Sequence, residues 1–216
     1  AEVEATRGCP YHCTFCAKEN FRDRYRKRPL PIVLEEIDRL QRQGVEYIYF
    51  IDEIFLPDHA LLEALASRGL KFGVQMRIDL FNGDELALLG RAGCVSIEAG
   101  VESVRPEGRS LLAKRCRLDT SALVDLLVTA KKHVPFVQAN LLEATDDPVD
   151  VEKFRQELQR HGVWANEPVP LFHYPGTPGY RQRFGAIDDD AWERAHHDYL
   201  TKHLSFSELQ AKTPLP

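Results

Sequence analysis

The 216-residue sequence contains no apolar run close to the roughly 20 residues that a membrane-spanning helix needs. It also lacks the charged and apolar opening of a secretory signal peptide. Neither sign of charge is in large excess, since the net charge is −5, so no nucleic-acid partner is expected. We therefore expect a cytoplasmic protein of one folded domain that has no membrane partner.

Cysteine is scarce as well, and its five residues are unevenly placed. An odd number argues against a disulfide framework, and three of the five crowd one loop. The other two, Cys94 and Cys116, lie far apart in the sequence and have no CxxC partner. Cys94 precedes an apolar stretch and is most simply a small buried side chain.

The three crowded cysteines, Cys9, Cys13 and Cys16, lie within the stretch CPYHCTFC. Thiolates are soft ligands that select iron–sulfur clusters or zinc. Because an electron-transfer cluster is normally held by four cysteines, a loop with three leaves one iron open to an exchangeable ligand. The alternative is a zinc site with His12 as the fourth ligand, but His12 adjoins Cys13 and would join the same tetrahedron only under strain.

The spacing CxxxCxxC, with the aromatic Phe15 before the last cysteine, resembles the signature of the radical S-adenosylmethionine (SAM) superfamily. The resemblance implies a 4Fe-4S cluster on Cys9, Cys13 and Cys16 as the catalytic centre, with Phe15 beside the cofactor. It implies that SAM chelates the open iron through its amino and carboxylate groups. It further implies that the reduced cluster cleaves SAM to a 5′-deoxyadenosyl radical, which then modifies a substrate.

Apolar residues along the chain alternate between strand and helix spacing six times. Continuous apolar strands of this kind predict a parallel sheet joined by right-handed crossovers. A complete eight-unit barrel usually needs about 250 residues, so an α/β fold with a partial, TIM-like (β/α)6 barrel is predicted. Radical SAM cores have a similar fold, and the core is expected to span residues 1–204, followed by a C-terminal tail over 205–216.

The predicted strands cover residues 2–6, 45–51, 71–77, 94–101, 136–142 and 163–171. The predicted helices cover residues 31–43, 58–68, 83–91, 109–114, 121–133, 148–161 and 188–203.

Chemistry in such barrels sits at the carboxyl ends of the strands. Asp52 and Glu53 follow the second strand, and an acidic residue there accepts hydrogen bonds from the SAM ammonium group in the family. We favour Glu53 over Asp52 for this role, and the alternative is that one of them caps the following segment. Arg77 ends the third strand, where it can hold the SAM carboxylate in a fork or pair with Asp79 instead.

The fourth strand ends in the sequence AGVES at residues 99–103, which resembles the GxES segment of a superfamily branch that includes cobalamin-dependent enzymes. The resemblance implies that Glu102 reaches a ribose hydroxyl of SAM and that Lys114 is the basic residue often found downstream. An ordinary surface lysine is the alternative for Lys114. Asn140, on the fifth strand, is expected near the adenine. The following segment, residues 143–148, departs from the glycine–proline turn of the relatives.

Members of that branch frequently carry a cobalamin-binding domain before the barrel. The sequence contains no DxHxxG cobalamin-binding motif. Cobalamin is therefore expected only with an upstream domain outside this chain. The chain opens at Ala1 directly before a predicted strand, as expected of an excerpt from a longer polypeptide.

A basic stretch at residues 21–28 follows the cysteine loop. It is placed to receive an anionic substrate or an acidic electron donor such as a flavodoxin, and a solvated connection is the alternative. We expect a small-molecule substrate, such as a sugar or an anionic compound. The sequence thus predicts a radical SAM enzyme of the oxidoreductase or transferase type, with cobalamin-dependent methylation as one outcome in a longer chain. The alternative is a non-catalytic iron–sulfur barrel used for redox sensing or protein interaction.

Overall fold

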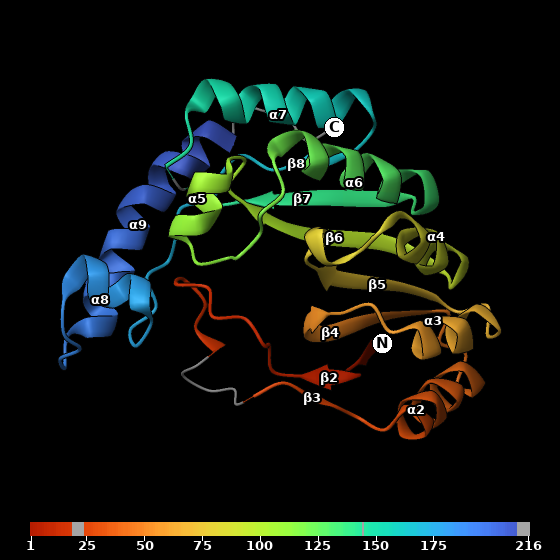
Figure 1. Ribbon diagram of the computed structural model, residues 1–216. Helices are drawn as coiled ribbons and strands as arrows, with labels where there is room; N and C mark the ends of the chain where they lie inside the picture. Colours follow the sequence, from red (N-terminus) through yellow and green to blue (C-terminus); the bar gives the residue numbers. More distant parts are fainter. Residues whose placement is uncertain (19–23, 144, 211–216) are drawn as a thin grey trace.

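The computed structural model describes residues 1–18, 24–143 and 145–210. Its centre is a six-stranded sheet in which all neighbouring strands are parallel. The strands follow one another across the sheet in chain order, and the sheet curves as an open arc (Figure 1). The predicted partial barrel with a parallel sheet is confirmed. The strands of the sheet are β1 (Glu2–Val3), β4 (Tyr47–Phe55), β5 (Lys71–Met76), β6 (Cys94–Glu102), β7 (Phe136–Leu141) and β8 (Trp164–Ala165).

A helix lies in each crossover between successive strands of the sheet, and these helices line one side of the arc (Figure 1). Four of them are preceded by a capping residue, an aspartate in three helices and an asparagine in one. In each case the side chain of this residue accepts a hydrogen bond from a backbone N–H of the first turn. No helix within the three described ranges is both long and apolar enough to cross a bilayer. The crossover helices are α2 (Leu30–Arg42), α3 (His59–Ala66), α4 (Gly83–Arg91), α6 (Thr120–His133) and α7 (Pro148–Arg160).

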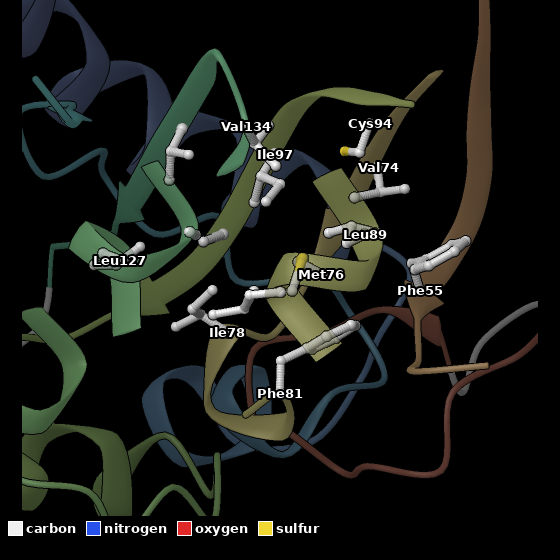
Figure 2. Packing of buried hydrophobic residues seen from close by; sticks show 14 of the residues in the cluster. Phe55, Val74, Met76, Ile78, Phe81, Leu89, Cys94, Ile97, Leu127 and Val134 are labelled. Atoms are coloured by element: carbon white, nitrogen blue, oxygen red, sulfur yellow. The ribbon is translucent and has the colours of Figure 1, made fainter. Parts of the chain in front are cut away.

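The sheet face beneath the helices forms the hydrophobic core. Phe50 and Phe72, on adjacent strands, are fully buried and meet edge to face with ring centroids 5.5 Å apart. Val74 and Ile97 lie close to Leu89 of α4 in the same cluster (Figure 2). Burying one such side chain stabilises the fold by about 1.5 to 3 kcal/mol, so this layer holds the strands in place.

The opposite face of the sheet is polar and partly exposed. In the sheet register, Gln75, Glu98 and Gln138 lie side by side on three adjacent strands. Tyr49 lies on the same face, and none of the four is buried. The prediction of continuously apolar strands is therefore wrong for this face. Strands read as apolar throughout only when both faces are covered, and here the crossover helices cover one.

Gly90 of α4 is the point where this helix touches the end of α6. A Cβ atom added at Gly90 would lie 2.5 Å from the carbonyl oxygen of His133, which is backbone and cannot move aside cheaply. We therefore expect Gly90→Ala to lower the free energy of unfolding by about 1 to 3 kcal/mol, as overpacking does. The control is Gly83→Ala in the same helix, where the nearest atom would be 4.0 Å away. Urea denaturation of both variants measures the difference, and equal stabilities would contradict the close approach.

The first predicted strand, residues 2–6, is divided in two. After β1 the chain turns into β2 (Thr6–Arg7), which pairs antiparallel with β3 (Arg26–Lys27). The buried carboxylate of Asp52 stabilises this turn, because it accepts hydrogen bonds from the N–H of Ala5 at 2.8 Å and the hydroxyl of Thr6 at 2.6 Å. Only β1 therefore belongs to the main sheet.

The sixth predicted strand, residues 163–171, is reduced to β8 and one isolated bridge between Val169 and Leu142. Proline at positions 168 and 170 provides no N–H for strand pairing. The side chain of Asn166 bonds the backbone of β7 instead. It accepts a hydrogen bond from the N–H of Leu141 at 2.7 Å and donates one to the carbonyl of Leu141 at 3.0 Å. An amide side chain thus replaces the missing strand pairing.

The remaining helices also differ from the prediction. The short helix expected over residues 109–114 is α5 (Pro106–Leu111), which begins at a proline that is well suited to a first helical turn. The last helix, α9 (Ala191–Gln210), begins three residues later than expected and extends past His203, so part of the expected tail is helical. The 3-10 helix η1 (Ile78–Leu80) and helix α8 (Pro178–Phe184) were not expected.

Candidate functional site

The cysteine loop follows β2 and is fixed between two distant parts of the chain. The N–H of Thr14 donates to the carbonyl of Leu112 at 3.0 Å, and the carbonyl of Thr14 accepts from the N–H of Gly179 at 2.9 Å. A Cβ at Gly179 would lie 3.0 Å from that carbonyl, so this position favours glycine. The buried Lys18 donates to the carbonyl of Cys9 at 2.7 Å. The loop is therefore held at the end of α5 and the start of α8.

All three loop cysteines are half-buried free thiols. Burial raises the pKa of the Cys9 thiol and of the Cys13 thiol. At Cys13 the positive charges of Lys114 and Arg77 oppose this rise in pKa, while the carboxylate of Glu102 adds to it. Residues from the ends of β5 and β6 and from the loop after α5 thus act electrostatically on one thiol of the loop.

This donor set fits an iron–sulfur cluster. Thiolate is a ligand that such clusters favour, and a cubane takes each thiolate on a different iron. Within the described ranges no three His, Cys, Asp or Glu side chains are already gathered around one point, as a single bound metal ion requires. Three thiols on one loop, each available to a different iron, therefore fit a 4Fe-4S cluster. Phe15, between the second and third thiols, is half-buried.

Asp52 and Glu53 point to opposite faces of β4, because successive strand residues alternate. Asp52 is 2% exposed, and both its oxygens are bonded to the turn between β1 and β2. Burial raises the pKa of its carboxyl group, while hydrogen bonds from Thr6 and Ala5 act against this rise. Glu53 contributes to raising the pKa of the Cys9 thiol, so its charge reaches the cysteine loop. Asp52 thus holds the turn between β1 and β2, and the preference for Glu53 as the ligand of the SAM ammonium group stays a prediction.

Arg77 lies under the cysteine loop and is nearly buried. Its Nε and Nη2 atoms donate to Asp79 at 3.2 and 2.6 Å, and its guanidinium group lies 4.2 Å from the ring centroid of Tyr11. Its Nη1 atom is buried and has no hydrogen-bond partner among the described residues. Arg77 therefore pairs with Asp79 and still has a donor available for a ligand, so the two expected roles are compatible.

Glu102 and Lys114 form a direct ion pair at the end of β6. Lys114 is 3% exposed, so the alternative of an ordinary surface lysine is wrong. Glu102 has a left-handed backbone with φ of 63°, which is uncommon for a residue with a side chain. Its side chain lies across Gly100, where a Cβ would be 2.6 Å from the carboxylate.

Asn140 lies beside Gly100 in the register of β6 and β7, on the polar face of the sheet. Its side-chain oxygen accepts a hydrogen bond from Gln138. The structure therefore brings Asn140 to the same end of the sheet as Glu102. Among the predicted site residues of this sheet end, Asp52 alone is directed away from it.

Sequence reasoning missed a second polar pair on this face. Tyr49 hydrogen-bonds Glu98, and burial together with this carboxylate raises the pKa of the tyrosine hydroxyl. Two residues earlier on each strand, the hydroxyl of Tyr47 lies 3.4 Å from the hydroxyl of Ser96. The alternation of tyrosine with isoleucine and phenylalanine over residues 47–50 was the available signal, because strict alternation indicates a strand with one uncovered face.

Comparison with known proteins decides the family. The profile described as the Radical SAM superfamily matches residues 3–154. The chain belongs to the radical SAM superfamily. Among curated relatives of this radical SAM chain, bacteriochlorophyllide d C-12(1)-methyltransferase of Chlorobaculum tepidum is 28% identical over 96% of the chain and 48% of that protein. Hopanoid C-3 methylase of Methylococcus capsulatus is 26% identical over 100% of the chain and 41% of that protein. The chain thus spans less than half the length of these relatives.

Solved structures support the fold of the radical SAM chain. The radical SAM methyltransferase TsrM of Kitasatospora setae, with cobalamin and a [4Fe-4S] cluster bound, superposes with a TM-score of 0.70. It is 20% identical, and the match covers 83% of this chain and 38% of TsrM. The cobalamin-dependent SAM radical enzyme OxsB gives a TM-score of 0.59 over 74% of the chain and 26% of OxsB. The predicted membership of the radical SAM superfamily is confirmed, and the two solved structures named here are of radical SAM enzymes that bind or depend on cobalamin.

Proposed function

We propose that this chain holds a 4Fe-4S cluster on Cys9, Cys13 and Cys16 and binds SAM at the carboxyl ends of β4 to β7. The observation that carries the proposal is the gathering of Arg77 and the buried Glu102–Lys114 pair around Cys13. A bound cluster would supply the electron that cleaves the sulfonium bond of SAM.

In this proposal each side chain around the cysteine loop binds a different group of SAM. The free Nη1 donor of Arg77 binds the SAM carboxylate, because a guanidinium donor and a carboxylate form a charge-assisted hydrogen bond. Glu53 accepts from the ammonium group. Glu102 accepts from a ribose hydroxyl, and its ion pair with Lys114 orients its carboxylate. Asn140 contacts the adenine from the neighbouring strand. The four groups fix SAM in one orientation over the loop.

We further propose that the reaction is methyl transfer to a small molecule, with cobalamin supplied by polypeptide outside this sequence. This follows from the relatives, several of which are named as methyltransferases or a methylase. An electron donor such as a flavodoxin would dock near the ribbon of β2 and β3. Arg26 and Lys27 of that ribbon are exposed, although Lys27 pairs with Asp58 at 3.1 Å. Residues 21–23 of the basic stretch lie outside the described residues.

The test is product analysis from SAM alone. We expect anaerobically reconstituted, reduced protein to convert SAM to methionine and 5′-deoxyadenosine, because a held cluster and an oriented sulfonium suffice for the cleavage. Liquid chromatography with mass detection measures both products, and Cys13→Ala protein is the matched control. A wild-type protein that carries the cluster and binds SAM but yields neither product would favour the alternative, a non-catalytic iron–sulfur barrel.

A further inference from the structure

Asp146 joins the loop after β6 to the loop after β7, although it lies 43 residues from Ser103. Its Oδ1 atom accepts a hydrogen bond from the hydroxyl of Ser103 at 2.8 Å. Its Oδ2 atom accepts from the backbone N–H of Val104 at 2.9 Å, and Arg105 Nε lies 3.8 Å from Oδ1. The Asp146 side chain is 5% exposed, so these bonds are made away from water, where they are strongest.

The peptide that Asp146 holds is also fixed from its other side. The guanidinium group of Arg109 is fully buried and donates to the carbonyls of Ser103 and Val104, each at 2.9 Å. A Cβ at Gly108 would lie 2.0 Å from the Ser103 hydroxyl, so helix α5 packs directly on this bond. The turn after β6 thus has its hydroxyl, N–H and carbonyl groups bonded.

This turn begins at Glu102, whose left-handed φ of 63° sets the direction of its side chain. The carbonyl of Glu102 accepts from the N–H of Leu142 at 2.9 Å, and the register between β6 and β7 shifts at this place. In this backbone conformation the carboxylate of Glu102 meets Lys114. Since Ser103 follows Glu102 directly, a change in the Ser103–Val104 peptide would alter the direction of the Glu102 side chain.

We propose that Asp146 is a positioning residue for SAM binding, acting through Glu102. It holds the Ser103–Val104 peptide so that Glu102 keeps its left-handed conformation and its ion pair with Lys114. The inference rests on the proposed function, because it takes Glu102 as a ligand of SAM. It also gives a role to Asp146, which lies in the segment that departs from the glycine–proline turn of the relatives.

The test compares Asp146→Asn with Asp147→Asn, the same change one residue further on. Asp147 begins α7 and accepts from the N–H of Val149 at 2.8 Å, so its role is confined to the start of that helix. Calorimetry measures the affinity of SAM for anaerobically reconstituted, oxidised protein, in which no turnover occurs. We expect about tenfold weaker binding for Asp146→Asn, because one acceptor for a buried donor is lost, and less than twofold for Asp147→Asn. Iron content should be unchanged in both.

A double-mutant cycle separates positioning from general loosening of the fold. If Asp146 acts through Glu102, the variant Glu102→Gln/Asp146→Asn binds SAM as weakly as Glu102→Gln alone. Two results overturn the inference, provided that Glu102→Gln alone weakens SAM binding. One is that the losses of affinity in the double variant are fully additive, and the other is that Asp146→Asn protein binds SAM with wild-type affinity. A Glu102→Gln protein with wild-type affinity overturns the proposed function of Glu102 instead. Should Asp146→Asn fail to fold, Ser103→Ala removes only one donor, and the same cycle with Glu102→Gln decides.

Discussion

Replacing Cys13 by alanine is expected to abolish the bound cluster. Cys13 is the middle thiol of the loop, and Thr14 beside it anchors the loop to the end of α5 and the start of α8. Two thiols on a loop cannot hold a cubane that already has one open iron. Anaerobic reconstitution followed by iron and sulfide analysis should give about one cluster per chain for the wild type and close to none for the variant.

The control for this loss is Cys94→Ala. Cys94 is 2% exposed under the helices, and burial raises the pKa of its thiol to about 12, so we expect it to take no part in holding iron. The variant should keep the full iron content and lose only some stability. If Cys94→Ala or Cys116→Ala removed as much iron as Cys13→Ala, the assignment of the ligands would be wrong.

Replacing Arg77 by methionine is expected to weaken SAM binding by about 10- to 100-fold while the cluster stays in place. The expected loss is that of one charge-assisted hydrogen bond, worth about 1.5 to 3 kcal/mol. Methionine removes the unpartnered Nη1 donor together with the guanidinium group that lies over the Tyr11 ring. Calorimetric titration of reconstituted protein with SAM measures the affinity.

Arg77→Met also leaves Asp79 buried without its partner, so a second variant is needed. Arg77→Lys keeps a positive charge beside Asp79 but loses the planar fork, and we expect it to be more stable than the methionine variant yet still weak in SAM binding. The matched control is Arg68→Met, which breaks a similar two-bond pair with Asp38 far from the cysteine loop. Wild-type affinity in both Arg77 variants would transfer the carboxylate contact to another residue.

The cysteine loop was readable from the sequence because its chemistry is local. Three soft ligands within a few residues indicate a cluster whatever the surrounding fold is. The six strand–helix units were readable for a similar reason, since each depends on apolar spacing over about ten residues. The chain order of the strands in the sheet then followed from the handedness of the crossovers.

The choice between Asp52 and Glu53 needed the true length of the strand. β4 continues to Phe55, so both carboxylates lie inside it rather than after it, and alternation sends them to opposite faces. The predicted strand ends at residue 51, and for residues beyond a strand end the alternation of side chains does not say which way they point. The alternation of Tyr47 and Tyr49 with apolar neighbours gives the polar face only as far as Phe50, because the register of β4 against β5 shifts between Phe50 and Phe55.

Other site features depend on contacts between distant parts of the chain. Asp146 reaches Ser103 across 43 residues, and Asn166 replaces strand pairing for Leu141 across 25. No periodicity or spacing predicts which side chain will reach another loop. The burial of Lys114 beside Glu102 is of the same kind, because it depends on how α5 and the following loop fold back over β6.

The most direct test of the central claim is the EPR spectrum of the reduced, reconstituted protein recorded with and without SAM. Three thiolates leave one iron without a protein ligand, so SAM that binds there must alter the electronic environment of the cluster. We expect the g values to shift on addition of SAM and to saturate at the affinity found by calorimetry. A spectrum that stays unchanged at saturating SAM would contradict the account, because SAM would then bind away from the cluster or the fourth iron would be held by the protein itself.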